Sequence, residues 1–221
     1  MKLMRIPIIF EFFGEETNLH FIFETVAFFL VFKYYVYQKN KKDHIDSKNR
    51  LLIVLGAIIG ALIGFRLLGV LENPQGLLHA SFMDIYRSKT IIGGLLMGLF
   101  TVEITKKMLK EKQSSGDLFT LPLIVGIFIG RIGCFLTGTI EPTYGRETDF
   151  FMAMNLGDGK FRHPIALYEI IFLIFLFLIL KSVQKKDILK NGSLFKYFMI
   201  TYFFFRFLID KIPRRSALSV A

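Results

Sequence analysis

Long apolar runs alternate with short polar segments along most of the chain, and each run is close in length to one membrane crossing. An α-helix needs roughly 20 predominantly apolar residues to cross the hydrocarbon core of a bilayer. The apolar residues come in blocks, without the strict alternation typical of a half-buried strand. The runs cover residues 21–37, 51–71, 91–105, 118–137, 165–180 and 194–212. The pattern predicts an all-α, polytopic integral membrane protein with about six transmembrane helices.

No internal repeat and no linker rich in proline or serine divides the chain, so residues 1–221 are expected to form a single membrane domain. The first 20 residues contain an apolar stretch of only five residues, which Glu11 and two further glutamates interrupt. A secretory signal peptide has a longer apolar region followed by a small-residue cleavage site. We therefore expect this N-terminal segment to be retained.

The composition fits a membrane protein, and the distribution of charge indicates its topology. The 221 residues are 53% hydrophobic and carry a formal net charge of +10. The basic residues gather in short segments between apolar runs, so their excess does not indicate a nucleic-acid partner. Segments 39–50, 106–117 and 181–192 are rich in lysine. The positive-inside rule places these segments in the cytoplasm, and it places both termini and the mixed segments 72–90 and 138–163 outside.

Ionisable side chains inside the apolar runs are the first candidates for function. A charge near the bilayer centre costs several kcal/mol unless it meets a partner, water or a ligand. These side chains belong to Glu24, Arg66, Glu103, Arg131, Glu169, Arg206 and Asp210. Two interpretations follow: the charges pair with one another to specify helix packing, or some of them bind a ligand.

Two arginines in these runs form a candidate anion site. Arg131 lies between Gly130 and Gly133, so a ligand or a neighbouring backbone can come close to its guanidinium. Arg206 follows Tyr202 by one helical turn and shares its face of the helix. Arginine holds phosphate with two parallel hydrogen bonds, which suits the head group of a phospholipid. The alternative is an interfacial anchor in which the arginine extends to the membrane surface, or an arginine that a nearby carboxylate neutralises.

A histidine and a carboxylate near the start of the fifth run are candidate proton acceptors. His163 precedes Pro164, which is typical of a helix start, and Tyr168 and Glu169 follow about one turn later. Glu169 is expected to meet Arg131 or another buried arginine as a counter-charge or as a proton acceptor. As an isolated feature, His163 is equally compatible with a helix cap or a surface residue. His79, in an outer segment, is kept as a reserve candidate.

For the remaining histidines and the single cysteine, the sequence favours no functional role. Cys134 lies in an apolar stretch, which favours a buried inert thiol over a nucleophile. His20 and His44 lie in polar segments. No grouping of His, Cys or carboxylates has metal-ligand spacing, so no metal site is predicted.

Several blocks together resemble the prolipoprotein diacylglyceryl transferase family. They are GRIGCFLTG at 130–138, YG at 144–145, RHPIALYE at 162–169, IIGGLLMG at 91–98, GFRLL at 64–68, and the Tyr202 to Arg206 spacing followed by Asp210. The blocks stand in the family's order from the second apolar run onward. The resemblance implies an enzyme of the bacterial cytoplasmic (inner) membrane that needs no cofactor. It would move the diacylglyceryl group of phosphatidylglycerol onto the lipobox cysteine of a prolipoprotein and release glycerol phosphate.

The resemblance also implies roles for individual residues. Arg131 and Arg206 match the essential arginines that hold the phosphate, Tyr202 matches their partner tyrosine, and Gly145 matches the glycine that ends the signature. The catalytic set is then Arg131, Arg206, Tyr202, His163 and Glu169, and the substrate-binding set is Arg131, Arg206, Gly130, Gly133, Gly145, Gly93, Gly94 and Arg66. On this interpretation the two arginines, Tyr202 and His163 surround one cavity that opens to the outer leaflet.

The chain departs from the family pattern where the proton of the thiol is handled. Ile92 stands where the family has a histidine before its glycine pair, and Cys134 stands where the signature has asparagine. Thr139 and Glu141 are both candidates for the family's glutamate. His163, Glu169 and His79 are the candidate replacements for the missing base.

Three functional hypotheses follow. The first is a phosphatidylglycerol-dependent diacylglyceryl transferase, or a divergent enzyme of that family, with a prolipoprotein signal peptide as the possible acceptor. The second is a protein that binds or transports a phospholipid without transferase activity. The third is a structural membrane protein in which Arg131 only holds helices together.

Overall fold

The structure, a computed structural model, contains helices at all six positions that the apolar runs predict. It describes residues 6–8, 10–12, 15–17, 19–71, 90–141, 143–187 and 189–211. The helices in this part of the chain are α1 (Leu19–Lys42), α2 (Ser47–Leu71), α5 (Ile91–Met108), α6 (Asp117–Thr137), α7 (Ile165–Lys186) and α8 (Ser193–Ile209). His79 and the segment 72–89 lie outside the described residues.

Several helices extend beyond the apolar runs into the lysine-rich segments. Helix α1 continues to Lys42, α5 to Met108 and α7 to Lys186. Lysine and glutamine are good helix formers, so a helix does not have to stop where its apolar stretch stops. Hydrophobicity therefore predicted the existence of these helices better than their ends.

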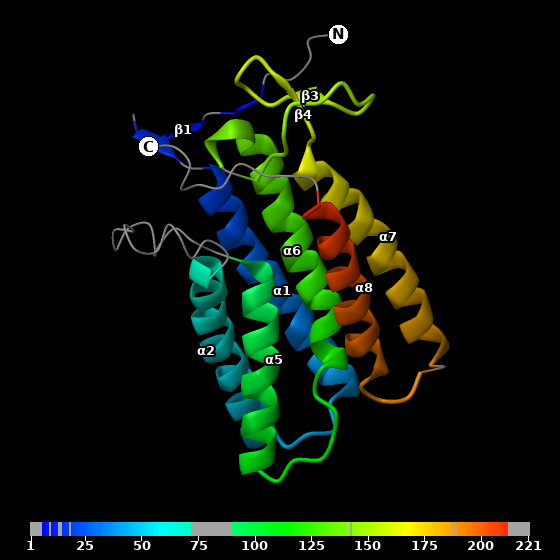
Figure 1. The fold of residues 1–221 in the computed structure, drawn as a ribbon. Helices are drawn as coiled ribbons and strands as arrows, with labels where there is room; N and C mark the ends of the chain where they lie inside the picture. The colour runs from blue at the N-terminus through cyan, green and yellow to red at the C-terminus, as the bar shows by residue number, and fades with distance from the viewer. Residues whose placement is uncertain are drawn as a thin grey trace. The chain divides into compact units, whose positions relative to one another are not determined.

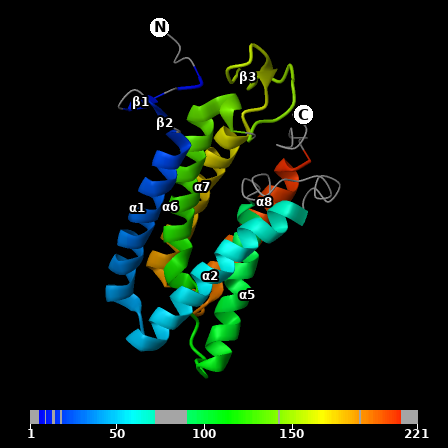
Figure 2. The same ribbon diagram turned by 90° about the vertical axis from the view of Figure 1, so that its left-hand side faces the viewer.

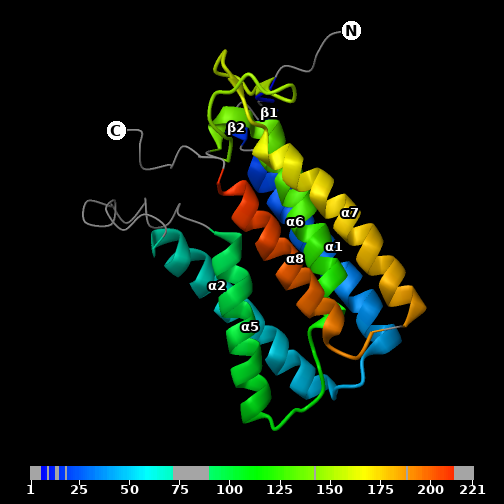
Figure 3. The same cartoon turned by 45° about the vertical axis from the view of Figure 1, so that its right-hand side comes forward.

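Residue contacts divide the chain into two compact units. In the first unit, helix α6 packs against α1, α7 and α8, as Figures 1 and 3 show. Its core is apolar: Leu121, Ile124, Leu173 and Phe198 are each at most 1% exposed. The expectation of a single membrane domain stays a prediction.

The second unit consists of helices α2 and α5, which pack closely against each other (Figure 2). A side chain at Gly64 would collide with the backbone of Gly93, and one at Gly93 would collide with that of Gly64. The hydroxyl of Thr101 also donates to the carbonyl of Gly56 across the pair at 2.8 Å. Small residues at the crossing thus let two backbones meet, as in many helix pairs in membranes.

The outer faces of the helices carry the apolar side chains that contact lipid. Phe28 on α1 is 74% exposed, Leu62 on α2 60% and Ile200 on α8 68%. Exposed apolar surface of this extent on several long helices is incompatible with an aqueous environment. Four helical segments are long and apolar enough to cross a membrane: Leu19–Asn40, Ser47–Leu71, Asp117–Ile140 and Ile165–Lys186. The protein is a polytopic membrane protein, and six crossings stay a prediction.

Short hairpins, which hydropathy did not predict, precede helices α1 and α7 in the first unit. Strands β1 (Phe10–Phe12) and β2 (Glu15–Thr17) pair antiparallel before α1, and β3 (Met154–Asn155) and β4 (Phe161–Arg162) pair antiparallel before α7. A short 3-10 helix, η1 (Gly138–Ile140), follows α6. Strands of two or three residues are too short to show an alternating pattern in the sequence.

An ion-pair cluster built around Arg162 holds the β3–β4 hairpin. Arg162 is 6% exposed, and its Nε donates to Asp158 Oδ2 at 2.8 Å. Burial raises the pKa of Asp158, but the hydrogen bonds from Arg162 and from the Lys160 amide, together with the charge of Arg162, outweigh it, and the net pKa lies below its usual value. Glu147 accepts from Lys160 and also pairs with Arg162, and the bond from Lys160 lowers the pKa of Glu147. These ion pairs thus link the loop of the hairpin to strand β4 and to the segment that precedes the hairpin.

The lysine-rich ends of the first unit lie together at the end opposite the β3–β4 hairpin. Gln184 near the end of α7 donates to Gln38 near the end of α1 at 3.2 Å. Asp117 at the start of α6 accepts from the amides of Gly192 and Phe195 at the start of α8, at 2.6 and 3.0 Å. Segments 39–42, 181–187 and 189–192 therefore lie at the same end of this unit (Figure 1).

Candidate active site

A single buried carboxylate gathers three of the predicted site residues in the first unit. Tyr202 donates its hydroxyl to Glu169 Oε1 at 2.7 Å, and Arg206 Nη1 donates to Oε2 at 3.2 Å. Arg131 Nε forms an ion pair with the same Oε2 at 3.0 Å. Helices α6, α7 and α8 each supply part of this group. The structure thus brings together Arg131, Glu169, Tyr202 and Arg206, which we call the arginine cluster.

The arginine cluster is almost entirely shielded from its surroundings. Glu169 and Tyr202 are 0% exposed, Arg206 4% and Arg131 7%. Two cations share one carboxylate, so the four side chains carry a formal net charge of +1 while Tyr202 is neutral. Asp210, whose side chain is 41% exposed, lies 3.5 Å from Arg206 Nη2 at the edge of the cluster. The cluster is therefore a buried cationic site, with partial compensation at its rim.

Helix geometry explains why these four side chains meet. Tyr202 and Arg206 are one turn apart on α8, as their spacing predicted. Arg131 stands six residues before the end of α6, and Glu169 four residues after the start of α7. At 1.5 Å per residue, both lie about 6 to 9 Å along their helices from the end that carries the β3–β4 hairpin. The cluster therefore sits toward that end and away from the lysine-rich segments.

Aromatic side chains hold Tyr202 in place. Its ring stacks on that of Phe198 with centroids 5.7 Å apart and meets Phe172 at 6.5 Å. Phe172 in turn stacks on Phe205 at 4.0 Å. A tyrosine fixed in this way keeps Glu169 at one position, because its hydroxyl anchors Oε1.

Not every donor of the cluster is used within the described part of the chain. Arg206 Nε is buried there without a hydrogen-bond partner. Arg131 Nη1 makes a long contact to Cys134 Sγ at 3.9 Å. At Gly130, next to Arg131, an added Cβ would meet nothing within 4 Å. Within the described part of the chain, the cluster therefore keeps an N–H donor, Arg206 Nε, that Glu169 does not use.

The glycines proposed for substrate binding differ in what they face. A Cβ at Gly133 would lie 2.9 Å from Phe23 Cβ and 3.2 Å from His20 Nδ1 on helix α1, so the backbone of a neighbouring helix fills this side. A Cβ at Gly145 would lie 2.8 Å from His163 Cβ. Both glycines therefore allow close approach of protein segments, whereas Gly130 faces open space.

Three further predicted residues belong to the second unit. Gly93 lies against Gly64, and an added Cβ at Gly94 would collide with the ring of Phe65. Arg66 is half-buried on α2. Their assignment to substrate binding stays a prediction.

His163 lies outside the arginine cluster. Its Nδ1 is 3.1 Å from the hydroxyl of Tyr168, and its ring lies 5.6 Å from that of Phe150. Its backbone carbonyl accepts from the amide of Gly145 at 3.0 Å. Among the described residues, its side-chain polar contact is therefore with a phenol and with neither arginine.

Glu103, another of the ionisable residues in the apolar runs, forms an exposed pair with Lys106 in the second unit.

Cys134 and His20, to which the sequence assigned no role, lie next to the arginine cluster. His20 Nδ1 is 3.6 Å from Cys134 Sγ, and His20 Nε2 is 3.2 Å from Glu24 Oε1. The spacing of His20 and Glu24 by four residues, one turn of a helix, was the only signal in the sequence. The contact with Cys134 joins residues 114 positions apart and needed the packing of α1 on α6.

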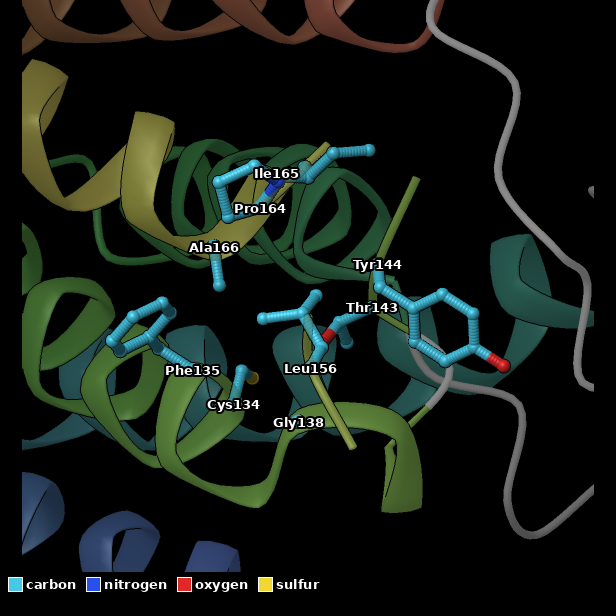
Figure 4. Close-up of a pocket in the computed structure, with 9 residues that line it drawn as sticks. All are labelled: Cys134, Phe135, Gly138, Thr143, Tyr144, Leu156, Pro164, Ile165 and Ala166. Atoms are coloured by element: carbon cyan, nitrogen blue, oxygen red, sulfur yellow. The ribbon is translucent and has the colours of Figure 1, made fainter. Parts of the chain in front are cut away.

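A small cavity adjoins Cys134 between the end of α6 and the start of α7 (Figure 4). Its water-accessible volume is about 10 Å³, which is room for a single water molecule. It is lined by Cys134, Phe135, Gly138, Thr143, Tyr144, Leu156, Pro164, Ile165 and Ala166. A cavity of this size holds no group larger than a water molecule, and neither arginine of the cluster lines it.

Comparison with known proteins accounts for this arrangement. The family model of prolipoprotein diacylglyceryl transferase matches residues 7–219. The chain belongs to the prolipoprotein diacylglyceryl transferase family. Arg131, Glu169, Tyr202 and Arg206 all lie within the matched residues, so the arginine cluster is part of the region shared with the family.

Individual family members are similar over much of the chain. The phosphatidylglycerol--prolipoprotein diacylglyceryl transferase of Ehrlichia ruminantium (strain Welgevonden) is 35% identical over 71% of this chain and 62% of its own length. The protein of that name in Campylobacter hominis is 29% identical over 92% of this chain and 77% of its own length. The one in Pseudoalteromonas translucida is 33% identical over 75% and 60%. The chain thus spans about three fifths of the length of the first and third of these transferases.

Proposed function

We propose that this protein transfers the diacylglyceryl group of phosphatidylglycerol to the thiol of a lipobox cysteine in a prolipoprotein. The observation that carries the proposal is the arginine cluster, in which two buried guanidinium groups share one carboxylate. An ion pair that only holds helices together needs one arginine for each carboxylate, because every further buried cation adds a desolvation cost. Asp210 pairs with Arg206 only at 3.5 Å and from a side chain that is 41% exposed, so the buried part of the cluster keeps a net positive charge. This charge favours a site that binds an anion, and the names of the relatives supply phosphatidylglycerol as that anion.

The reaction requires a negative charge to be stabilised as it develops. The sulfur of the acceptor forms a bond to the terminal glyceryl carbon of the lipid, while the bond from that carbon to the phosphate oxygen breaks. Glycerol phosphate leaves with the electron pair and gains one negative charge. Arg131 and Arg206 are fixed in a dry site before the lipid arrives, so they can stabilise this charge with little reorganisation.

Glu169 and Tyr202 act in this proposal as positioning residues. Glu169 holds both guanidinium groups at one oxygen, and Tyr202 fixes Glu169 through the other oxygen. The two arginines are thereby held next to each other, so that both can bind one phosphate group. The lipid phosphate would meet the cluster from the open side at Gly130.

We also infer that the protein lies in the bacterial cytoplasmic membrane with its lysine-rich segments in the cytoplasm. The lysine-rich segments 39–42, 181–187 and 189–192 lie at one end of the first unit, and the positive-inside rule favours the cytoplasmic side for that end. The arginine cluster is then nearer to the outer leaflet. The two test cysteines are introduced into a chain that carries Cys134→Ala. An impermeant maleimide should label Lys160→Cys in intact spheroplasts, and Asn191→Cys only after lysis. The reverse pattern would exclude this orientation.

The transfer itself is tested with the purified full chain in nanodiscs that contain phosphatidylglycerol with a labelled diacylglyceryl group. A lipobox peptide serves as the acceptor, and label on the peptide and released glycerol phosphate are measured together. Replacing one preorganised charge-stabilising donor typically lowers kcat by about 10²- to 10³-fold. We expect at least that loss for Arg131→Ala and for Arg206→Ala, and no loss for the exposed Arg146→Ala.

Lipid retention separates the transferase from a protein that only binds or moves lipid. If the wild type retains phosphatidylglycerol but never labels the peptide, the binding role replaces the transferase role. If Arg131→Ala unfolds no more readily than Arg146→Ala and transfers label at the wild-type rate, the arginine cluster is not the site of transfer.

A further inference from the structure

Thiol, imidazole and carboxylate groups follow one another from helix α6 to helix α1 beside the arginine cluster. Cys134 Sγ lies 3.6 Å from His20 Nδ1, and His20 Nε2 lies 3.2 Å from Glu24 Oε1. Cys134 is 6% exposed, and the side chains of His20 and Glu24 are 17% and 32% exposed. The row thus begins at the buried sulfur of Cys134 and ends at the partly exposed carboxylate of Glu24.

The order of the groups sets the direction in which a proton can move. A carboxylate only accepts hydrogen bonds, so Nε2 of a neutral His20 carries the hydrogen that faces Glu24. Nδ1 is then the acceptor that faces the S–H group of Cys134. Once Nδ1 takes the proton, Glu24 stabilises the imidazolium. A third group that orients the base in this way is the usual arrangement of an activated nucleophile or base.

The sulfur of this row also contacts the cation that we assign to the lipid phosphate. Arg131 Nη1 lies 3.9 Å from Cys134 Sγ, while Nε of the same guanidinium pairs with Glu169. The positive charge stabilises a negative sulfur. Because Arg131 contacts Cys134 and is assigned to the lipid phosphate, Cys134 lies close to the position where the phosphate ester has to break.

Close helix packing builds the row into the fold. Gly133 precedes Cys134, and any side chain there would press on His20 and Phe23. The backbone of α6 therefore approaches α1 closely enough for Cys134 and His20 to touch. On its other side, Cys134 lines the cavity of Figure 4, so the sulfur keeps an open side.

We propose that Cys134, His20 and Glu24 form a proton relay that takes up the proton of the acceptor thiol. The inference rests on the proposed function and names its general base. The acceptor S–H proton passes to Cys134 Sγ as the Sγ proton passes to His20 Nδ1, and the acceptor thiolate attacks the glyceryl carbon. His20 ends the step as an imidazolium, and it returns the proton to the released glycerol phosphate or to water.

The relay makes the reaction depend on pH in a defined way. Among the described residues, the titratable or charged groups that face His20 or Cys134 are Glu24, Arg131 and Glu141. A free cysteine thiol has a pKa of about 8.5, so the acceptor ionises without help only in alkaline solution. A base that removes the proton of the acceptor thiol is therefore important at neutral pH. Above the thiol pKa of about 8.5, the acceptor ionises by itself and the base is dispensable.

The kinetic test uses the nanodisc assay with the full chain between about pH 6.5 and about pH 9.5. His20→Gln should slow transfer about hundredfold at neutral pH, the size of a typical general-base contribution. The transfer rate of His20→Gln should rise about tenfold per pH unit and approach the wild-type rate at the alkaline end of this range. Glu24→Gln, at a partly exposed position, should show a smaller loss with the same trend, and the exposed His44→Gln should match the wild type throughout. A deficit of His20→Gln that stays constant with pH, or no deficit, would overturn the relay.

The single cysteine permits a second test that does not need transfer activity. Iodoacetamide can alkylate only Cys134, and intact mass reports the product. At neutral pH, alkylation should be at least about tenfold faster in the wild type and in His44→Gln than in His20→Gln. Equal alkylation rates in the three proteins would overturn the relay. If the wild type transfers no label at any pH, the proposed function fails, and the alkylation rates alone then decide on the relay.

Discussion

Replacing the carboxylate that the two arginines share is the most direct test of the arginine cluster. In Glu169→Gln the side chain keeps its shape and can still accept from the Tyr202 hydroxyl at Oε1. At the position of Oε2, however, an amide NH₂ would face Arg131 Nε and Arg206 Nη1, which are donors themselves. Two buried cations would then lack their counter-charge.

The expected cost is large for a single amide substitution. Removing one partner of a buried ion pair typically costs about 3 to 5 kcal/mol, because the remaining charge is left uncompensated. For a chain of 150 to 250 residues, each kcal/mol lowers Tm by about 2 to 4 °C. The Tm of Glu169→Gln should therefore fall by roughly 6 to 20 °C. Glu103→Gln removes a carboxylate whose side chain is 61% exposed, and it should change Tm little.

An anionic lipid should reverse part of this loss if the cluster binds phosphate. Thermal unfolding is therefore measured in nanodiscs of phosphatidylcholine with and without phosphatidylglycerol. The anionic lipid should raise the Tm of Glu169→Gln more than that of the wild type, because the phosphate supplies the missing negative charge. The reasoning is refuted if Glu169→Gln melts with the wild type in phosphatidylcholine. It is also refuted if phosphatidylglycerol stabilises Glu169→Gln no more than Glu103→Gln.

Three further predictions concern the scaffold that carries the site. Gly133→Ala should lower stability by about 1 to 3 kcal/mol, because its Cβ presses on α1, whereas Gly130→Ala should be neutral or stabilising, and thermal unfolding compares the two. Lys160 and Arg162 lower the pKa values of Glu147 and Asp158 in the folded protein. The stability that these ion pairs contribute is complete above the usual carboxyl pKa of about 4, and it is lost as the pH falls through the lowered pKa values. Protection of the Thr148 and His163 amides in hydrogen exchange should therefore drop in acid before that of α6, and equal loss would contradict the assignment. Asp117→Ala should cost about 1 to 2 kcal/mol in denaturant unfolding, since it leaves the first amides of α8 without their acceptor, and the exposed Asp149→Ala serves as the control.

The helices and the meeting of the two arginines followed from simple physical rules. Apolar runs of spanning length can satisfy their backbone groups in lipid only as helices, so six helices were predictable without any structure. A buried arginine needs a partner, which made Glu169 a candidate for Arg131 and Arg206. The sequence did not show that both arginines bind the same oxygen, because this depends on the rotations of α6, α7 and α8 about their axes.

The features that the sequence did not show are those set by tertiary contacts or by very short elements. The β3–β4 hairpin rests on two-residue strands and on ion pairs of Arg162, none of which produces a period in hydropathy. His163 looked like a base because it precedes a helix rich in site residues, yet its side chain pairs with Tyr168. His20 looked unremarkable because its partner Cys134 is far along the chain.

The residue at position 134 allows the relay to be tested against the family's own alternative. The resemblance places asparagine where this chain has Cys134, and an asparagine amide neither gains nor loses a proton near neutral pH. Cys134→Asn therefore interrupts proton transfer to His20 while it keeps a polar side chain of family type at this position. If Cys134 serves as the relay, the variant should transfer slowly at neutral pH and recover in alkali, as His20→Gln does. If Cys134→Asn is as fast as the wild type at neutral pH, the thiol is dispensable, and the proton of the acceptor leaves by another route.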